Sequence, residues 1–259
     1  MPKLHAIYFS ATDTTHHCVE SFCQGFGSRP DTSINLADDF AATFPEIADS
    51  DVAVIAVPVY GGRVPRQVAT ALERLKGNNA SAIAMVVYGN RDYDDALLEL
   101  TDILHRGNFR IAGAGAFIGQ HSIFPKVAKA RPDSSDEQKL RQFGKECESV
   151  CRNGFSPDQI PFIKGNRPYK KSGGVPLHPQ ANETDCVKCA KCARLCPVSA
   201  IPADKPFVTD TAKCISCGRC IAACTPNARR YSGTAYSLTG LIFKSLFSKR
   251  KEPEWTTSK

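Results

Sequence analysis

The sequence lacks the long apolar run that a membrane-spanning helix requires, since no stretch approaches about 18 consecutive apolar residues. Its N-terminus also lacks the apolar region and the small-residue cleavage site of a secretory signal peptide. We therefore expect an intracellular, cytoplasmic protein without a transmembrane segment. Because the cytosol keeps thiols reduced, the 12 cysteines are not expected to form structural disulfides.

Two common catalytic signatures are also missing. No G-x-G-x-x-G fingerprint of nicotinamide-binding sheets is present, and no G-x-S-x-G sequence surrounds Ser10. These absences disfavour a nicotinamide-dependent dehydrogenase and a serine hydrolase. No catalytic residue is assigned from the sequence.

Cysteine and charge are unevenly distributed along the 259 residues. Eight of the 12 cysteines lie between residues 186 and 224. Residues 1–163 hold 16 Lys/Arg and 20 Asp/Glu, a net charge of −4, whereas residues 164–259 hold 17 and 6, a net charge of +11. This asymmetry indicates at least two functional regions. A dense group of cysteines in a reducing compartment indicates a metal site.

The apolar pattern of the first 150 or so residues alternates between two periodicities. Short apolar runs predict buried strands at residues 3–9, 51–57, 80–87 and 109–118. Helical spacing predicts helices at residues 14–24, 64–76, 96–104 and 135–151. This alternation predicts an α/β fold, a doubly wound parallel sheet with helices on both faces.

The rest of the chain divides by composition. Prolines and glycines interrupt residues 154–183, which we interpret as a linker between a domain at 1–153 and a small domain at 184–232. Residues 233–259 form a basic tail with one apolar stretch, at 238–247. An amphipathic helix that contacts a membrane surface or a partner is one interpretation of this stretch. Packing against the protein itself is the preferred one.

An internal repeat with a 28-residue offset fills residues 186–228, and each half reads C-x2-C-x2-C-x3-C. In proteins with two such runs, three thiolates of one run and the fourth of the other bind one iron–sulfur cluster. The predicted ligands of cluster 1 are Cys186, Cys189, Cys192 and Cys224. Those of cluster 2 are Cys214, Cys217, Cys220 and Cys196. Thiolates also suit zinc, so a pair of structural zinc sites is the alternative.

This segment resembles bacterial dicluster ferredoxins, which carry two [4Fe-4S] clusters. It departs from their pattern at Thr225, which follows the last cysteine where the first half has Pro197. Five cations lie within the ligand loops, namely Lys188, Lys191, Arg194, Lys213 and Arg219. Cations beside a cluster stabilise its reduced, more negative form and raise its potential. Solvated surface charge is the alternative interpretation of these residues.

Three loops are predicted to leave the carboxyl ends of the strands, the edge at which doubly wound sheets bind ligands. The first is rich in hydroxyls and precedes a helix N-terminus, which suits a phosphate, although hydroxyl-rich helix caps are common. The other two offer tyrosines and glycines for stacking and close backbone approach. The loops comprise Ser10, Ala11, Thr12, Asp13, Thr14 and Thr15; Pro58, Val59, Tyr60, Gly61 and Gly62; and Tyr88, Gly89, Asn90, Arg91 and Tyr93.

At these loops the domain resembles flavodoxin, whose sheet has the order 2-1-3-4-5 and which binds FMN. The resemblance implies that residues 10–15 hold the phosphate and that the other two loops flank the isoalloxazine ring. It makes Tyr60 and Tyr93 candidate stacking residues. Asp13 stands where the usual phosphate loop has glycine, so FMN binding is expected to be weaker than in flavodoxin unless this carboxylate turns outward.

Four further cysteines, Cys18, Cys23, Cys147 and Cys151, are predicted to be buried packing residues, with a redox or metal role as the alternative. His16 and His17 are predicted to lie on a helix surface rather than on a phosphate.

The domain order resembles that of the flavodoxin–ferredoxin fusion electron-transfer proteins of anaerobic bacteria. This implies a relay of electrons between FMN, two [4Fe-4S] clusters and redox partner proteins, in an electron carrier rather than an enzyme with its own substrate. The main alternative is a flavin-dependent iron–sulfur oxidoreductase that reduces a small molecule. A nucleic-acid-binding iron–sulfur protein is a further alternative, and no nucleic acid partner is expected.

Overall fold

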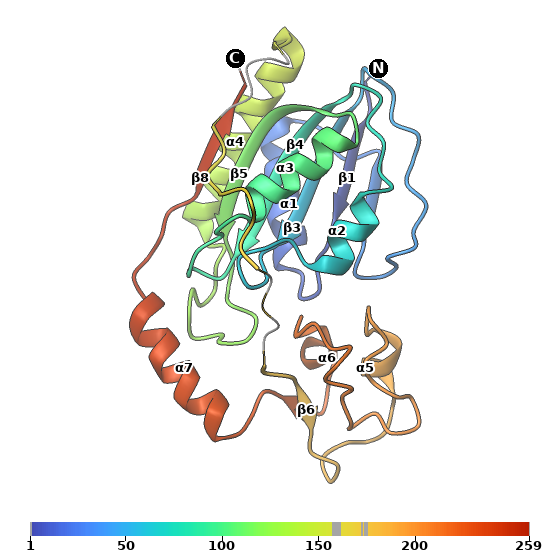
Figure 1. Cartoon of the computed structure of the whole chain (residues 1–259), viewed down its shortest axis with the longest axis vertical. Helices are drawn as coiled ribbons and strands as arrows, with labels where there is room; N and C mark the ends of the chain where they lie inside the picture. Colours follow the sequence, from blue (N-terminus) through green and yellow to red (C-terminus); the bar gives the residue numbers. More distant parts are fainter. Residues whose placement is uncertain (1, 157–161, 172, 174–175, 259) are drawn as a thin grey trace.

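The computed structural model describes residues 2–156, 162–171, 173 and 176–258 (Figure 1). Its centre is a sheet of five parallel strands in the order β2-β1-β3-β4-β5. The strands are β1 (Leu4–Tyr8), β2 (Thr32–Asn35), β3 (Val52–Pro58), β4 (Ser81–Tyr88) and β5 (Arg110–Ile118). The predicted α/β fold class and the flavodoxin-like strand order are therefore confirmed.

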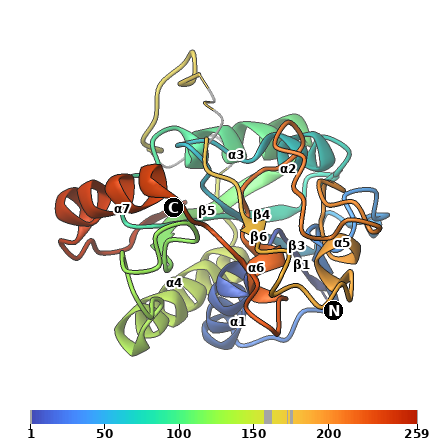
Figure 2. The same cartoon turned by 90° about the horizontal axis from the view of Figure 1, so that it is seen from below.

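Two pairs of helices cover the two faces of this sheet (Figure 2). They are α1 (Thr14–Phe26) with α4 (Ser134–Asn153), and α2 (Arg66–Leu72) with α3 (Ala96–Arg106). Strands β3 and β4 are buried along almost their whole length, because helices lie above and below them. Helix α2 is shorter than the predicted 64–76, since Pro65 precedes it and the backbone closes into a tighter turn after Leu72.

The small C-terminal unit repeats one local pattern twice. Each cysteine run ends in a single helical turn, α5 (Lys191–Arg194) in the first half and α6 (Arg219–Ala222) in the second. Two short strands, β6 (Gln180–Ala181) and β7 (Arg229–Arg230), pair antiparallel. The unit lies beyond the carboxyl ends of the parallel strands (Figure 1). This position brings it next to the loops that the sequence marks as a ligand site.

The C-terminal tail returns to the first domain. After α7 (Thr234–Phe247), β8 (Glu254–Thr257) pairs antiparallel with β5 and becomes the sixth strand of the sheet. The Trp255 ring stacks near Phe117, and its Nε1 donates a hydrogen bond of 2.7 Å to Glu146. The prediction of a separate tail at 233–259 misses this strand, because four residues after a charged run give no clear strand signal.

Residues 164–170 of the predicted linker are held against the first domain, whereas residues 177–181 belong to the small unit through β6 and through hydrogen bonds from Ser216 and Arg229. The Asp95 carboxylate accepts hydrogen bonds from the backbone N–H groups of Asn166, at 2.8 Å, and Lys170, at 2.6 Å. The hydrogen bond from Lys170 is the main cause that lowers the pKa of Asp95. The Arg167 guanidinium pairs with Asp102. Residues 166–170 therefore follow the surface of α3. Residues 157–161, 172 and 174–175 of the predicted linker lie outside the described residues.

Candidate functional site

The eight cysteines of the repeat line two separate cavities, four cysteines to each. We call the first group cage 1 and the second cage 2. Cage 1 surrounds a space of about 330 Å³ and consists of Cys186, Cys189, Cys192 and Cys224. Cage 2 surrounds about 320 Å³ and consists of Cys196, Cys214, Cys217 and Cys220. Each cage combines three cysteines of one run with the fourth of the other, the same groups that the sequence analysis predicts as ligand sets.

The thiols of cage 2 lie in a less polar, more buried setting. Burial raises the pKa of Cys217 to about 11 and that of Cys220 to about 12. Backbone N–H groups already point at sulfur here, from Ala200 to Cys196 at 3.2 Å and from Ser216 to Cys214 at 3.4 Å. Buried thiols become thiolates when a metal group binds them, and N–H donors stabilise the sulfur charge that results.

Each cage sets its four cysteines around one cavity. Within the described residues, no group of three His, Cys, Asp or Glu side chains converges closely enough to hold a single metal ion. Each cage therefore offers four thiols around one cavity to a metal group.

Arg229 is a buried cation beside the cages, with 2% of its surface exposed. Its side chain donates hydrogen bonds to the carbonyl oxygens of Pro179, Pro206 and Val208 and to the Thr209 hydroxyl. Its Nε has no partner, and its hydrogen bonds within the described residues go to carbonyl and hydroxyl oxygens rather than to a carboxylate. A buried charge without a counter-ion is costly. Because Arg229 lines the cavity of cage 1 and its charge also acts on Cys214 and Cys220 of cage 2, an anionic group bound in either cage would balance it.

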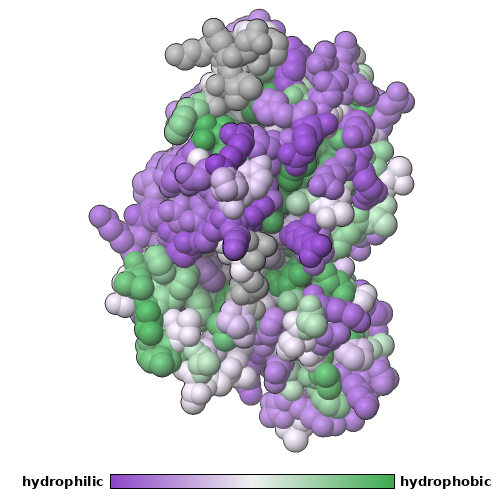
Figure 3. All heavy atoms as spheres, in the orientation of Figure 1, coloured by the Kyte–Doolittle hydropathy of each residue, from purple (hydrophilic) through white to green (hydrophobic). Residues whose placement is uncertain are grey.

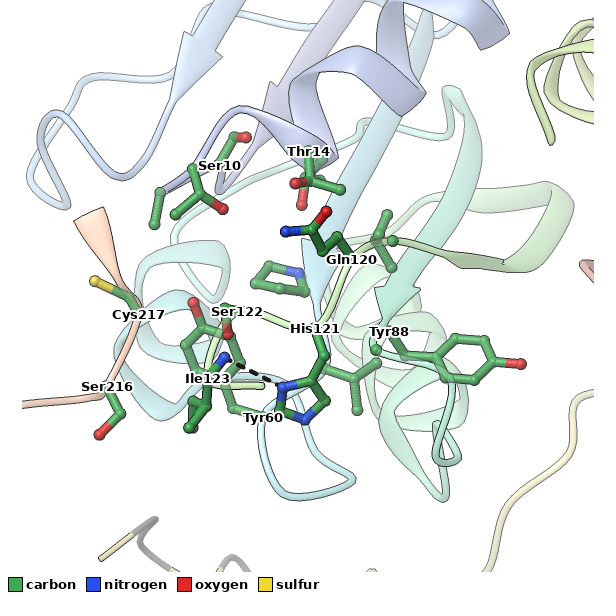
Figure 4. A pocket seen from close by; sticks show the side chains of 18 of the residues that line it. Ser10, Thr14, Tyr60, Tyr88, Gln120, His121, Ser122, Ile123, Ser216 and Cys217 are labelled. Carbon is green, nitrogen blue, oxygen red and sulfur yellow. Dashed lines mark hydrogen bonds between the residues drawn. The ribbon is translucent and has the colours of Figure 1, made fainter. Parts of the chain in front are cut away.

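A third cavity lies where β1, β3, β4 and β5 end, and we call it the strand-end pocket (Figure 4). It measures about 740 Å³ including its open mouth. The predicted residues that line it are Ser10, Ala11, Thr12, Thr14, Thr15, Pro58, Val59, Tyr60, Gly61, Tyr88 and Gly89. The structure therefore brings the three predicted loops together.

The loop between β1 and α1 presents free donors to this pocket. The backbone N–H groups of residues 11–15 have no hydrogen-bond partner among the described residues, and Thr14 begins the helix. The Ser10 hydroxyl accepts from the His16 N–H at 3.1 Å, which leaves its own proton free to donate. Free N–H groups at a helix N-terminus attract anions.

Asp13 is turned away from the pocket. Its backbone adopts φ 67°, the left-handed conformation that glycine usually supplies. Its side chain is 82% exposed and accepts a hydrogen bond of 2.9 Å from His16, while it does not line the pocket. This orientation removes the like-charge conflict expected with a bound phosphate. His17 lies on the helix surface as predicted and contacts Glu137 at 2.8 Å.

Two predicted residues of the third loop have structural roles instead. Tyr93 is buried in the core, where its hydroxyl donates to Glu254 at 2.8 Å and Lys164 lies over its ring. Asn90 donates to the carbonyl oxygens of Phe247 and Lys249, at 2.7 and 2.8 Å. Both contacts involve the C-terminal segment, whose return to the sheet the sequence does not indicate. Neither residue lines the strand-end pocket.

Gly62 and Arg91 also do not line the strand-end pocket. Both lie where the loop after β3 contacts the loop after β4. An added Cβ at Gly62 would meet the Asp94 carboxylate at 2.0 Å. The Arg91 guanidinium pairs with the same carboxylate. These two loops therefore pack edge to edge, and only their inner parts reach the cavity.

Sequence reasoning missed the loop that follows β5. Gly119, Gln120, His121, Ser122 and Ile123 all line the strand-end pocket, as does Val87 of β4. The rule that ligands bind at the carboxyl ends of parallel strands applies to β5 as well, so this loop could have been included. Burial lowers the pKa of His121 to about 4, and its Nδ1 accepts from the Ile123 N–H at 3.2 Å. His121 is thus a neutral imidazole with its proton on Nε2.

The loop of cage 2 closes one side of the strand-end pocket. Ile215, Ser216 and Cys217 line the same cavity as Tyr60 and the β1–α1 loop (Figure 4). Burial raises the pKa of Tyr60 well above its ordinary value, and the neighbouring Cys217 adds to the shift. Cys217 therefore belongs to two sites at once, since it also lines the cavity of cage 2.

Polar contacts hold the small unit in this position. The Arg219 guanidinium of α6 donates to the Ala37 carbonyl oxygen and pairs with the Asp38 carboxylate, both in the segment after β2. An added Cβ on Gly218 would lie 3.5 Å from the Thr12 methyl group. The start of α6 thus contacts the first domain directly.

The other four cysteines pack in the first domain. Cys18, Cys23 and Cys147 are buried between α1, α4 and the sheet, and Cys151 is half-buried beside them. Burial raises the pKa of Cys23 to about 12 and that of Cys151 to about 11. Protonated, buried thiols of this kind act as small apolar side chains.

Comparison with known proteins finds a family match for the second region. Residues 162–237 match the family model of a 4Fe-4S dicluster domain. The match begins inside the segment interpreted as a linker. A comparison with curated protein sequences finds no match. Within the described part of the chain, no helix combines the length and the apolar character needed to cross a membrane.

Solved structures similar to this chain include several flavodoxins. A flavodoxin from the domain Archaea has 11% identity and a TM-score of 0.40, covering 58% of this chain and 99% of its own. Flavodoxin 1 from Bacillus cereus has 16% identity and a TM-score of 0.40, covering 57% and 97%. Rubredoxin oxygen:oxidoreductase from Desulfovibrio gigas has 14% identity and a TM-score of 0.43, covering 59% and 37%.

The order of its own strands establishes the fold of the first domain, independently of these likenesses. The chain therefore joins a flavodoxin-like sheet to a segment that matches the 4Fe-4S dicluster family, which is the arrangement of a flavodoxin–ferredoxin fusion.

Proposed function

We propose that this protein is an electron carrier that relays electrons between FMN, two [4Fe-4S] clusters and external redox partners. The observation that carries the proposal is the position of Cys217, which lines both the strand-end pocket and the cavity of cage 2. Flavins exchange one or two electrons and iron–sulfur clusters exchange one at a time, so together they connect partners of both kinds.

The residues of the strand-end pocket would hold FMN in a fixed orientation. The free N–H groups of residues 11–15 and the hydroxyls of Thr12 and Thr14 suit its phosphate. Tyr60 offers an aromatic, neutral side chain to the ring. Gly89 lets the loop after β4 lie close to the loop after β5, since an added Cβ on Gly89 would meet the His121 ring at 2.6 Å.

The cages would hold the two clusters in different environments. Cage 1 would bind its cluster with Cys186, Cys189, Cys192 and Cys224, and cage 2 with Cys214, Cys217, Cys220 and Cys196. Cage 2 shares a wall with the strand-end pocket, whereas cage 1 includes the exposed Cys189. This arrangement supports a route for electrons from the pocket through cage 2 to cage 1 and then to a partner at the protein surface.

External protein partners would approach at cage 1. Val187 is 67% exposed there, and the exposed Lys188 and Lys191 flank it. A partner with an acidic surface around its own cofactor matches this charge. Removing a cation from this surface would mainly slow association, because electrostatic steering acts on the encounter rate.

Anaerobic purification with quantified iron, sulfide and flavin tests this proposal directly. We expect about eight iron atoms and about eight sulfides per chain, together with one FMN. Stepwise reduction followed by EPR should show two interacting clusters. Zinc in place of iron and sulfide would contradict the cluster assignment. Fast steady-state turnover with a small-molecule acceptor, without any protein partner, would instead favour the oxidoreductase alternative.

A pair of tyrosine variants tests the flavin site. Tyr60→Ala removes an aromatic wall of the pocket, so we expect FMN affinity to fall by about tenfold, corresponding to the roughly 0.5–1.5 kcal/mol of one aromatic contact plus its buried area. Tyr93→Phe is the matched control, because Tyr93 does not line the pocket and loses only its hydrogen bond to Glu254. Equal flavin affinity in Tyr60→Ala and the unmodified protein would rule out this placement.

A further inference from the structure

Helix α7 has two apolar faces, and only one of them packs against the protein. Its aromatic side chains Tyr236, Phe243 and Phe247 face the loop after β5, where the Phe243 ring contacts Phe124 at 5.0 Å and His121 at 4.8 Å between centroids. Asn90 binds the carbonyl oxygens at the end of the helix. The helix is therefore folded and oriented by its inner face alone.

The outer face of α7 is aliphatic and exposed. Leu238, Leu241, Ile242 and Leu246 follow helical i, i+3, i+4, i+8 spacing, with 63%, 69%, 53% and 66% of their surface exposed. They are four of the seven exposed large hydrophobic side chains in the described residues. Figure 3 shows an apolar patch where this helix lies, and Figures 1 and 2 show that the helix projects from the body.

The charged residues along this stretch of the chain have one sign. No Asp or Glu occurs between residues 231 and 251, whereas Lys244 and Lys249 are exposed on or just after the helix. An apolar helix face flanked by lysines suits the boundary between the headgroups and acyl chains of an anionic bilayer. Because the helix is already folded, binding there would not cost the entropy of forming it.

We propose that α7 docks this protein on an anionic lipid surface, with Leu238, Leu241, Ile242 and Leu246 inserted among the lipids and Lys244 and Lys249 at the headgroups. A second copy of the chain fits this face less well. A symmetric pair of such helices would bring lysines of like charge together. Its contact would also lack the aromatic anchors that dominate protein interfaces, since the aromatic residues of α7 face inward.

Docking on lipid through this face uses no residue that lines the strand-end pocket, so it can be tested apart from the electron-transfer proposal. The inner face packs on His121 and Phe124, in the same loop as Gln120 and Ser122 of the pocket. A lipid-bound α7 would therefore hold the pocket at a fixed height and orientation above the membrane.

The experiment is flotation of the full-length protein, with its native cofactor content, on vesicles of phosphatidylcholine with or without phosphatidylglycerol. We expect binding to the anionic vesicles and weaker binding as salt is raised. The double variant Leu241→Ser/Ile242→Ser should partition at least about tenfold less, and Lys244→Gln/Lys249→Gln should lose its preference for anionic lipid. Phe162→Ser is the matched control, because Phe162 is 89% exposed but lies elsewhere, and its binding should be unchanged.

A second measurement reports insertion itself. In Leu241→Trp, the added indole should shift its emission to the blue with anionic vesicles, against a constant background from Trp255. Failure of the unmodified protein to float with anionic vesicles would overturn the proposal. So would a dimer in light scattering that Leu241→Ser/Ile242→Ser dissociates while vesicle binding stays absent, since that result would assign the face to a second copy.

Discussion

The two halves of the cysteine repeat build cavities of nearly equal size, but they face different neighbours. Cage 1 opens to solvent at Cys189. Cage 2 is lined by Ile201 and Ile215 and shares Cys217 with the strand-end pocket. The sequence repeat thus produces two similar sites in the small unit. Cage 2 faces the first domain, and cage 1 faces solvent.

Positions related by the 28-residue offset show how this difference arises. Ile201 in the first half corresponds to Arg229 in the second, and both are buried. Lys191 in α5 corresponds to Arg219 in α6. Lys191 is exposed, whereas Arg219 contacts the first domain through Ala37 and Asp38. Substitutions at such pairs compare the two cages within one protein.

The largest effect is expected from Cys189→Ala and Cys217→Ala, the second cysteines of the two runs. Each should remove one cluster and lower the iron content by about half. The variants should differ in the microwave-power saturation of the flavin EPR signal, because a paramagnetic cluster speeds relaxation only at short range. Cys189→Ala should retain fast relaxation, and Cys217→Ala should lose it. Identical saturation in both would contradict the placement of cage 2 beside the flavin.

A smaller effect is expected from Arg229→Met and its counterpart Ile201→Met. Removing the buried cation disfavours the reduced, more negative clusters, so their potentials should fall, by on the order of 100 mV for a charge several ångströms away at an effective dielectric constant near 20. Ile201→Met changes the shape of the side chain but not its charge. The cluster potentials of this variant should therefore change much less than those of Arg229→Met. Redox titration followed by EPR measures both. Equal shifts in the two variants would exclude an electrostatic role of Arg229.

The contact between the domains should respond to Arg219→Gln but not to Lys191→Gln. The lost hydrogen bond and ion pair are expected to cost roughly 1 kcal/mol, since Asp38 is exposed and screened. This corresponds to about fivefold faster hydrogen exchange in residues 214–220 if the small unit opens from the first domain. Unchanged exchange in Arg219→Gln would show that apolar contacts alone hold the unit in place.

The smallest effect is a pH dependence of the linker. The pKa of Asp95 lies below its ordinary value of 3.8 because the ionised carboxylate binds the Lys170 N–H. A lowered pKa means that this stabilisation is complete above about pH 4 and is lost as the pH falls through the folded-state value. Cleavage of the linker by pepsin should accelerate only below about pH 4. In Asp95→Asn, cleavage should be faster throughout and should lack this pH dependence.

The features that the sequence predicts best are those determined by residues close together in the chain. Apolar runs such as residues 52–58 and 81–88 locate buried strands, and the spacing within each cysteine run determines which thiols share a loop. Strand β2 was not located, because its four residues are mostly half-buried and show no clear alternation. Strand β8 was missed for a different reason, since it is held by pairing with β5 and by the Trp255 contacts.

The candidate flavin site shows the same division. The β1–α1 loop was predicted almost completely, because its donors lie next to one another in the chain and only Asp13 turns away. Tyr93 and Asn90 were assigned to the pocket because they follow β4 closely, but they contact Glu254, Phe247 and Lys249 from the other end of the chain. No local pattern reveals such a contact.

Residue order alone thus determined the local chemistry of this protein: which thiols lie on one loop, which strands are buried on both faces, and where N–H groups remain free to meet an anion. Tertiary structure decided what those groups face. It placed Cys217 against the strand-end pocket, left Cys189 at the surface, and returned the last strand to the edge of the sheet. The reason is that short-range periodicity and spacing act over a few residues, whereas these contacts join segments more than 100 residues apart and form only when the whole chain is packed.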